Sequence, residues 1–377
     1  MTKYELIATA TFGLEAVVRR EIEGLGYEIL KTEDGKVTFA GDERAIVRSN
    51  LWLRCADRVL LKTCEFEALT FEDLFQGIRA FAWEDIIPAD GKFTVTCSTV
   101  KSKLHNPPAI QSVSKKAIVE RMGGAYGLEQ FPETGAEYTV KVTLLKDRAT
   151  VTIDTSGTGL HKRGYRTAPV DAPMKETLAA ALVLLSFYRS GRALADPCCG
   201  SGTIPIEAAM IGMNIAPGLS RTFASEAWSL IPQEMWKEER ANAYAAITEM
   251  PVSIYASDID PKAVHAARVN AEEAGVDMCI RFTRADVRDL DVSALQDEHG
   301  MIITNPPYGE RIGEQDEIDS VFKALRRFCR ENPGWSLFVI TPDKDAEKKI
   351  MGRQANRRRK LYNGNIETTY YQFHGEK

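Results

Sequence analysis

Four short motifs in the second half of the chain have residue types suited to chemistry, and each follows an apolar run. The first, at 196–203, reads Asp-Pro-Cys-Cys-Gly-Ser-Gly-Thr. Its glycines would let backbone N–H groups approach a ligand where a helix begins, although a tight structural turn explains them nearly as well. Cys198 and Cys199 could suggest redox chemistry, but small residues packed under the loop are the favoured interpretation.

Acidic residues follow the next two apolar runs. Asp258 ends the first of these runs, the position where nucleotide-binding sheets hold a ribose diol, because a carboxylate accepts from both hydroxyls. Asp260 precedes Pro261 and is interpreted as a helix N-cap. Asp286 follows the second run, and its oxygen could accept a hydrogen bond from an exocyclic amine.

The fourth motif, Asn305-Pro306-Pro307-Tyr308, directly follows the apolar run 301–304. Two prolines could form only a rigid turn. The order of the motifs argues otherwise: a glycine-rich loop, a ribose acid, a third acid and this tetrapeptide each end a successive run.

The elements that must position these motifs alternate between buried strand and helix from residue 175 onward, which predicts an α/β, doubly wound, Rossmann-like parallel sheet. We expect strands at 193–196, 253–258, 280–283, 301–304 and 336–341, and helices at 178–188, 204–211, 261–274 and 318–328.

The N-terminal half predicts two small α+β units followed by a connector at 160–173. We expect strands at 4–9, 37–39, 59–66, 92–99, 137–144 and 148–155, and helices at 14–25, 44–53, 71–81 and 110–123.

Composition excludes several classes of protein. The chain has 377 residues, enough for two or three domains, and it has neither a membrane-spanning apolar run nor a signal-peptide pattern, so we expect a cytoplasmic protein with no membrane partner. Its seven cysteines form no CxxC pair, which argues against a disulfide framework and predicts no metal site. The net charge of −5 means that only local clusters could bind nucleic acid.

Basic residues gather in three clusters, each of which alone is most simply a solvated face. They lie at 100–124, at 161–166, and at 344–360, where eight basic residues accompany two acidic ones.

The ordered motifs resemble those of class I S-adenosylmethionine-dependent methyltransferases that modify exocyclic amines, whose hallmark is (Asp/Asn)-Pro-Pro-(Tyr/Phe). Segments 160–166, 172–180 and 215–219 further resemble the 23S ribosomal RNA guanine-N2 methyltransferases. The resemblance implies a ferredoxin-like α+β domain at 1–66, a THUMP RNA-binding domain at 67–160, and a methyltransferase domain with its connector at 161–377. Some members carry a second methyltransferase domain, but we expect one activity here.

The resemblance also implies a role for individual residues. S-adenosylmethionine would be held by Asp196, Cys198, Gly200, Gly202, Thr203, Asp258 and Asp286, with the loop on its methionine end, Asp258 on the ribose and Asp286 on the adenine. The target base would be held by Asn305, Pro306, Pro307 and Tyr308, with Asn305 and the Pro306 carbonyl accepting from the amine and Tyr308 stacking on a flipped base. RNA would be contacted by Lys101, Lys103, Lys115, Lys116, Arg121, Arg163 and Arg166. For residues 357–360, contact with RNA and a merely solvated face are equally expected.

The expected partner is therefore RNA, as 23S ribosomal RNA or a precursor of the large ribosomal subunit. Two alternatives stay open: adenine-N6 methylation of RNA or DNA, because the tetrapeptide serves both amines, and a non-catalytic, cofactor-binding ribosome-assembly factor. A nicotinamide oxidoreductase is disfavoured, because a third loop glycine and a hydride-handling constellation are absent from the sequence.

Overall fold

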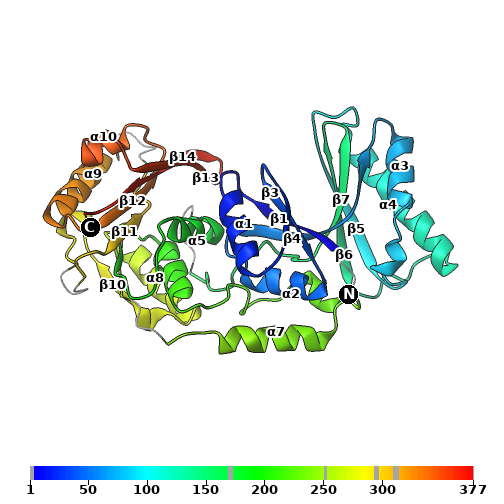
Figure 1. Cartoon of the computed structure of the whole chain (residues 1–377), viewed down its shortest axis with the longest axis horizontal. Helices are drawn as coiled ribbons and strands as arrows, with labels where there is room; N and C mark the ends of the chain where they lie inside the picture. Colours follow the sequence, from blue (N-terminus) through cyan, green and yellow to red (C-terminus); the bar gives the residue numbers. More distant parts are fainter. Residues whose placement is uncertain (1–3, 169–172, 250–252, 293–296, 309–313, 377) are drawn as a thin grey trace.

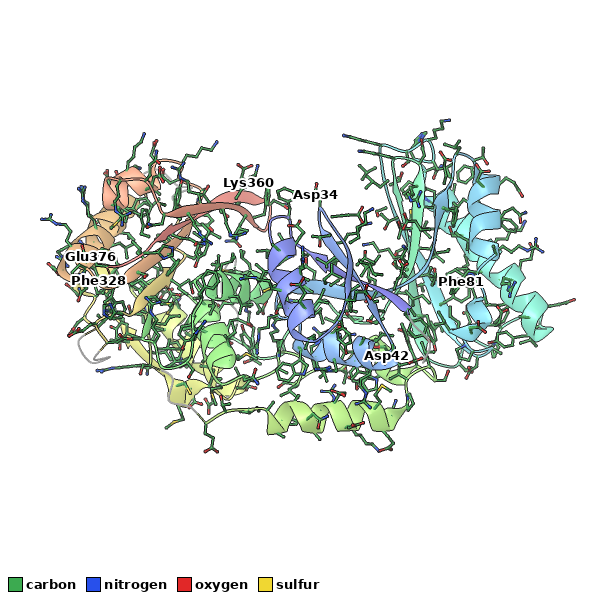
Figure 2. The ribbon with its side chains drawn as sticks, viewed as in Figure 1. Asp34, Asp42, Phe81, Phe328, Lys360 and Glu376 are labelled. Atoms are coloured by element: carbon green, nitrogen blue, oxygen red, sulfur yellow. The ribbon has the colours of Figure 1, made fainter. Side chains whose placement is uncertain are left out.

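The computed structural model describes residues 4–168, 173–249, 253–292, 297–308 and 314–376. They form an elongated molecule in which an N-terminal lobe and a C-terminal lobe are each built on a seven-stranded sheet (Figure 1). Figure 2 shows the side chains on the ribbon, with Phe81 labelled in the N-terminal lobe and Phe328 in the C-terminal lobe.

The N-terminal sheet has the order β2-β3-β1-β4-β7-β6-β5. Its strands are β1 (Tyr4–Ala10), β2 (Ile29–Glu33), β3 (Lys36–Gly41), β4 (Ala56–Glu67), β5 (Lys92–Val100), β6 (Glu137–Leu145) and β7 (Arg148–Asp154). Strand β4 pairs with β1 through Leu61 and Leu6, and with β7 through Leu61 and Ile153. The two predicted α+β units therefore share one continuous sheet.

Four helices cover this sheet: α1 (Glu15–Gly24), α2 (Glu43–Trp52), α3 (Phe71–Arg79) and α4 (Pro107–Tyr126). Helix α4 begins three residues before its predicted start, because the Asn106 side chain accepts from Ala109 N and Pro107 occupies the first turn. Helices α3 and α4 pack on each other beside β4 and β5.

The C-terminal sheet has the order β10-β9-β8-β11-β12-β14-β13, which confirms the predicted doubly wound sheet. Its strands are β8 (Leu194–Asp196), β9 (Ile254–Asp258), β10 (Ile280–Arg284), β11 (Met301–Thr304), β12 (Ser336–Thr341), β13 (Arg357–Asn363) and β14 (Ile366–Phe373). Strands β8 to β12 are parallel, and β14 runs antiparallel to both β12 and β13.

Helices cover both faces of this sheet, which explains its apolar strands. Met301 and Ile303 belong to the core under α5 (Glu176–Leu185), α6 (Thr203–Gly212) and α8 (Pro261–Glu273), whereas Ile302 packs under α9 (Glu314–Glu331) and α10 (Ala346–Met351). None of the helices in the described part of the chain is long and apolar enough to cross a bilayer.

One helix of the C-terminal half, α7 (Gln233–Ala245), lies along the N-terminal lobe (Figure 1). Arg44 of α2 pairs with Glu238, at 2.9 Å, and with Glu239. Helices α7 and α10 and strands β2 and β13 are not predicted from the sequence.

Candidate functional site

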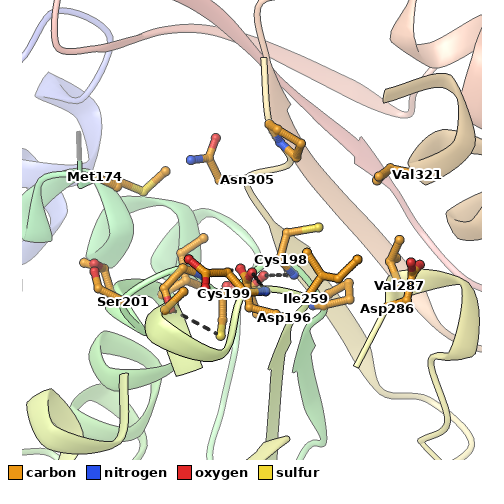
Figure 3. A pocket seen from close by; sticks show the side chains of 18 of the residues that line it. Met174, Asp196, Cys198, Cys199, Ser201, Ile259, Asp286, Val287, Asn305 and Val321 are labelled. Atoms are coloured by element: carbon orange, nitrogen blue, oxygen red, sulfur yellow. Dashed lines mark hydrogen bonds between the residues drawn. The ribbon is translucent and has the colours of Figure 1, made fainter. Parts of the chain in front are cut away.

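A cleft of about 1050 Å³ opens where β8, β9 and β11 end (Figure 3). After β8 the chain forms β9 and β10 on one side of β8, and it then forms β11 and β12 on the other side. Such a switch point is where doubly wound sheets bind ligands. The predicted site residues that line the cleft are Asp196, Cys198, Gly200, Thr203, Asp258, Asp286, Asn305 and Pro307.

Asp196 ends β8 and is 1% exposed. Its Oδ1 accepts from Thr304 Oγ1 at 2.8 Å and from Cys198 N at 3.2 Å, while its Oδ2 is buried with no hydrogen-bond partner among the described residues. Burial raises its pKa from 3.8 to about 7, aided by the charge of Asp258 and opposed by these two hydrogen bonds. The orphaned oxygen can therefore accept a cationic donor entering the cleft.

Asp258 ends β9 and is held by backbone groups. Its Oδ2 accepts from Gly200 N at 2.9 Å and its Oδ1 from Asp260 N at 3.0 Å. Each oxygen retains a lone pair, so the carboxylate can still accept from two vicinal hydroxyls. Gly200 has a φ of +53° and no atom within 4 Å of a Cβ built on it, so the loop leaves open space there.

Asp286 is paired with Arg288, which the sequence analysis did not single out. Arg288 donates from its backbone N at 2.8 Å and from Nε at 2.9 Å, and its guanidinium lowers the pKa of the Asp286 carboxyl. Both residues line the cleft, and Asp286 keeps acceptor capacity for a further donor.

Asn305 follows β11 and projects over the loop that carries Cys198, with Met174 to one side (Figure 3). Its Oδ1 is buried and has no hydrogen-bond partner among the described residues. An unsatisfied buried amide oxygen costs free energy unless a ligand donates to it. Asn305 is therefore arranged to accept from a molecule bound in the cleft.

Tyr308 is half-buried, and its hydroxyl accepts from Asn363 Nδ2 at 2.9 Å. Burial raises the pKa of Tyr308 to about 12, so the phenol stays neutral at physiological pH. Asn363 ends β13. The hairpin of β13 and β14 thus positions the last residue of the tetrapeptide.

Three predicted residues are not among those that line the cleft: Gly202, Pro306 and Tyr308. Gly202 has a φ of +83°, and a Cβ there would lie 3.0 Å from Ala267 Cβ. Glycine at this position is therefore explained by its conformation and by close packing of α6 on α8.

The predicted RNA contact by Arg163 is wrong, because this residue is 2% exposed. It pairs with Glu207 at 3.2 Å, and it donates to the carbonyl of Leu160 at 2.6 Å and to that of Arg54. Its guanidinium is thus used inside the junction between the lobes and is not available to a phosphate.

Arg166 is mostly directed inward, which leaves it less available for its predicted contact with RNA. Its side chain is 20% exposed and lies 3.3 Å from Glu176 Oε1. It donates to the Met174 carbonyl at 2.8 Å and to Thr203 Oγ1 at 3.0 Å. Arg166 therefore supports two residues that line the cleft.

The predicted basic residues of the N-terminal lobe lie on α4 and on the loop before it. Lys101, Lys103, Lys115 and Lys116 are exposed. Lys115 lies over the Phe93 ring and Lys116 over the Phe75 ring, at 5.6 and 5.8 Å. Arg121 is ion-paired with Glu84, which makes it less available than the lysines.

Sequence reasoning missed Thr304, Glu207 and Asn363. Thr304 is the polar last residue of an otherwise apolar strand, and Glu207 is a lone charge in an apolar helix that required a buried partner. Asn363 precedes Gly364, a pair typical of tight β-hairpins, so a signal for the hairpin was present.

The residues of the cleft fit S-adenosylmethionine. The Asp196 Oδ2 can accept from the ammonium of its methionine end, Asp258 from the ribose diol and Asp286 from the adenine amine. The Asn305 oxygen, which has no hydrogen-bond partner among the described residues, remains available to a second molecule in the cleft.

Comparisons with known proteins agree with this geometry. Residues 163–372 match the RMKL-like methyltransferase domain, residues 5–60 the RlmL ferredoxin-like domain, and residues 68–154 the THUMP domain.

Two relatives cover nearly the whole chain. The Bacillus subtilis protein named "Putative RNA methyltransferase YpsC" is 47% identical, over 99% of this chain and 96% of its own length. The ribosomal RNA large subunit methyltransferase K/L of Syntrophotalea carbinolica is 36% identical over 98% of this chain, which spans about half (53%) of that longer protein.

Two solved structures superpose closely. SMU.472, named as "a putative methyltransferase complexed with SAH", is 41% identical with a TM-score of 0.94, and the match covers 100% of this chain and 99% of that one. A Listeria monocytogenes protein, named as a predicted N6-adenine-specific DNA methylase, is 44% identical with a TM-score of 0.94, covering 100% of this chain and 97% of that one.

The fold and the cleft define a class I, S-adenosylmethionine-dependent methyltransferase. The chain belongs to the RMKL-like methyltransferase family and carries an RlmL-type ferredoxin-like domain and a THUMP domain. The predicted family, fold and cofactor are thereby confirmed.

Proposed function

We propose that this enzyme methylates the exocyclic N2 amine of a guanine in 23S ribosomal RNA or its precursor, with the base flipped out of its helix. The observation that carries the proposal is the buried Asn305 Oδ1, which has no partner in the described part of the chain and lies in the same cleft as the carboxylates proposed to hold the cofactor. The THUMP domain and the ribosomal RNA methyltransferase relative support RNA as the substrate.

Asn305 and Pro306 would act on the amine itself. The nitrogen lone pair of an exocyclic amine is delocalised into the ring, which makes it a weak nucleophile. Hydrogen bonds from its two N–H groups to the Asn305 Oδ1 and the Pro306 carbonyl would draw the nitrogen toward pyramidal geometry and aim its lone pair along the line of attack. Neither proline has an N–H group that could compete.

The rest of the site would hold the reactants in line. S-adenosylmethionine supplies an already activated methyl group, so positioning, worth up to ~7–11 kcal/mol, is the main task of the protein. Asp196, Asp258 and Asp286 would fix one reactant and Asn305, Pro307 and Tyr308 the other. The side chain of Tyr308, whose hydroxyl is held by Asn363, would offer a face for the flipped base.

The exposed lysines of the THUMP domain would collect phosphates for a chain whose net charge is −5. Lys101, Lys103, Lys115 and Lys116 support this role. Arg121 would take part only by exchanging Glu84 for a phosphate.

Adenine-N6 methylation is the second candidate, because a structural relative is named as a predicted DNA methylase of that specificity. The same acceptor pair would serve the N6 amine. The THUMP domain favours RNA over DNA.

The test is transfer of labelled methyl groups from S-adenosylmethionine to ribosomal RNA from cells lacking the protein, compared with DNA and with precursor particles. We expect incorporation into RNA that is lost in Asn305→Ala, while this variant still binds S-adenosylhomocysteine. Incorporation into DNA alone, or into no nucleic acid, would contradict the proposal.

A further inference from the structure

Two aromatic side chains from different lobes meet at the junction near the tetrapeptide. Phe12 lies in the loop between β1 and α1, and Tyr362 is the second-last residue of β13. Their ring centroids are 6.1 Å apart at an angle of 73°, and Phe12 is 47% exposed. Edge-to-face packing leaves at least one face of each ring uncovered by the other.

The aromatic pair lies at the same edge of the sheet as the cleft. Strand β14 is antiparallel to both β12 and β13, so β13 runs parallel to β11 and both strands end at the carboxyl edge. Asn363, the residue after Tyr362, donates to the Tyr308 hydroxyl at 2.9 Å. A strand of nucleic acid leaving the proposed base pocket therefore passes close to these rings.

The loop that carries Phe12 is fixed in place. Gly13 has a φ of +92°, and a Cβ there would lie 2.6 Å from the Lys360 carbonyl oxygen, so only glycine allows this approach to β13. The Glu15 carboxylate accepts from Gly13 N and from Gly35 N, each at 2.9 Å. A fixed aromatic ring loses little conformational entropy when a ligand stacks on it.

One basic side chain lies beside the aromatic pair, and a cluster of arginines lies further along β13, on the strand face opposite to Tyr362. Lys360 Nζ lies 5.6 Å from the Tyr362 centroid and 2.7 Å from Glu367 (Lys360 is labelled in Figure 2). Arg20, Arg357 and Arg359 have no acidic partner among the described residues. Burial, together with the charges of Arg20 and Arg357, lowers the pKa of Arg359, which shows that like charges gather across the junction. Such a field attracts phosphates.

We propose that Phe12 and Tyr362 form a stacking platform for unpaired RNA bases next to the target nucleotide, and that Arg20 of α1, with Arg357 and Arg359 further along β13, attracts phosphates of the same RNA. Aromatic faces within a basic surface are the general means of binding single-stranded nucleic acid without reading its sequence. The platform rests on the proposed RNA substrate and adds a binding site outside the methyl-transfer cleft. It also gives the ferredoxin-like domain, which supplies Phe12, a direct part in holding RNA.

The test compares Phe12→Ala with Phe12→Trp, and with Tyr244→Ala as a matched control. Tyr244 is a 58% exposed aromatic residue on α7 and is not among the residues that line the cleft. The probes are a short labelled single-stranded oligoadenylate, the same strand in a duplex, and large-subunit ribosomal RNA as methyl acceptor. Melting temperature and S-adenosylhomocysteine affinity confirm that each variant is folded.

We expect Phe12→Ala to weaken binding of the single strand roughly 5- to 150-fold, the range for loss of one stacked base, and to raise KM for ribosomal RNA. Phe12→Trp, Tyr244→Ala and duplex binding should be unaffected. Wild-type affinity and wild-type methylation in Phe12→Ala would overturn the platform while leaving the proposed function intact. Absence of methylation of any RNA by the wild-type enzyme would overturn both.

Discussion

Thr304 Oγ1 donates a 2.8 Å hydrogen bond to Asp196 Oδ1, joining the end of β11 to the end of β8. Thr304 directly precedes the tetrapeptide, and Asp196 opens the glycine-rich loop. The strand end that precedes the tetrapeptide is thereby tied to the strand end that precedes the glycine-rich loop. This contact fixes the relative position of the proposed acceptor site and the proposed cofactor site, on which in-line transfer would depend.

The raised pKa of Asp196 predicts a pH-dependent cofactor affinity. In the free enzyme the carboxyl titrates at about 7, so below that pH it is mostly protonated and cannot pair with an ammonium group. S-adenosylhomocysteine should therefore bind more tightly as pH rises from 5.5 to 7, by at most about tenfold per pH unit, and should level off above that range. Calorimetric titration across this range measures the effect.

Asp196→Asn serves as the control for this profile. It should bind S-adenosylhomocysteine weakly, and its affinity should not change between pH 5.5 and 7. Since the folded state of the wild type holds a proton that the unfolded state releases between about pH 4 and 7, wild-type stability should fall as pH rises through this window, and the variant should not show this fall. A wild-type affinity that is independent of pH would contradict the role of Asp196.

Asn305→Ala should remove the acceptor for the target amine while leaving the cofactor residues in place. Loss of one preorganised hydrogen-bonding group typically lowers kcat about 10²- to 10³-fold. We expect that loss in single-turnover assays, with S-adenosylhomocysteine affinity within twofold of the wild type. Comparable losses in both measurements would mean that Asn305 supports the cofactor instead.

Tyr308→Ala should lose much more turnover than cofactor affinity, because stacking of the flipped base is lost, an effect of about 1–3 kcal/mol. Tyr308→Phe keeps the ring and loses only the hydrogen bond from Asn363, so it should retain most activity. Equal losses of turnover and cofactor affinity in Tyr308→Ala would exclude the stacking role.

Arg163→Met should destabilise the protein by about 3–5 kcal/mol, because Glu207 would be left as a buried charge without its partner. Urea denaturation measures this change. The double variant Arg163→Met with Glu207→Leu should recover part of the loss, and Arg281→Met, at an exposed position of β10, should be neutral. Near-wild-type stability of Arg163→Met would show that the ion pair is unimportant to the junction.

Lys115→Ala with Lys116→Ala should weaken RNA binding and make it less sensitive to salt. If both lysines neutralise phosphates, the slope of log affinity against log salt concentration should decrease in magnitude by about 2. Filter binding at several salt concentrations measures this slope. Lys237→Ala, an exposed lysine on α7, should leave it unchanged.

The sequence predicted which residues lie together at the cleft where the local pattern marks the end of a strand. Asp196, Asp258 and Asn305 were identified because each ends an apolar run, and parallel strands bring such ends to one edge. Asp260 was correctly interpreted as an N-cap, since its side chain accepts from Lys262 N. The residues at the carboxyl ends of the strands in a doubly wound sheet can thus be predicted from the local sequence.

The errors concern contacts between segments far apart in the chain. Arg163 lies in a basic, aromatic segment typical of an RNA-binding surface, but Glu207, 44 residues later, holds it inside the junction. Helix α7 was missed because its partner, α2, belongs to the other lobe. Burial of a charge depends on such distant partners, and spacing along the chain does not reveal them.

The identity of the methylated nucleoside tests the central claim most directly. Large-subunit ribosomal RNA from cells lacking the protein would be incubated with the enzyme and S-adenosylmethionine, digested, and analysed by mass spectrometry beside the Asn305→Ala variant. N2-methylguanosine formed only by the wild type is the predicted result. N6-methyladenosine, or RNA that gains no methyl group, would contradict the account.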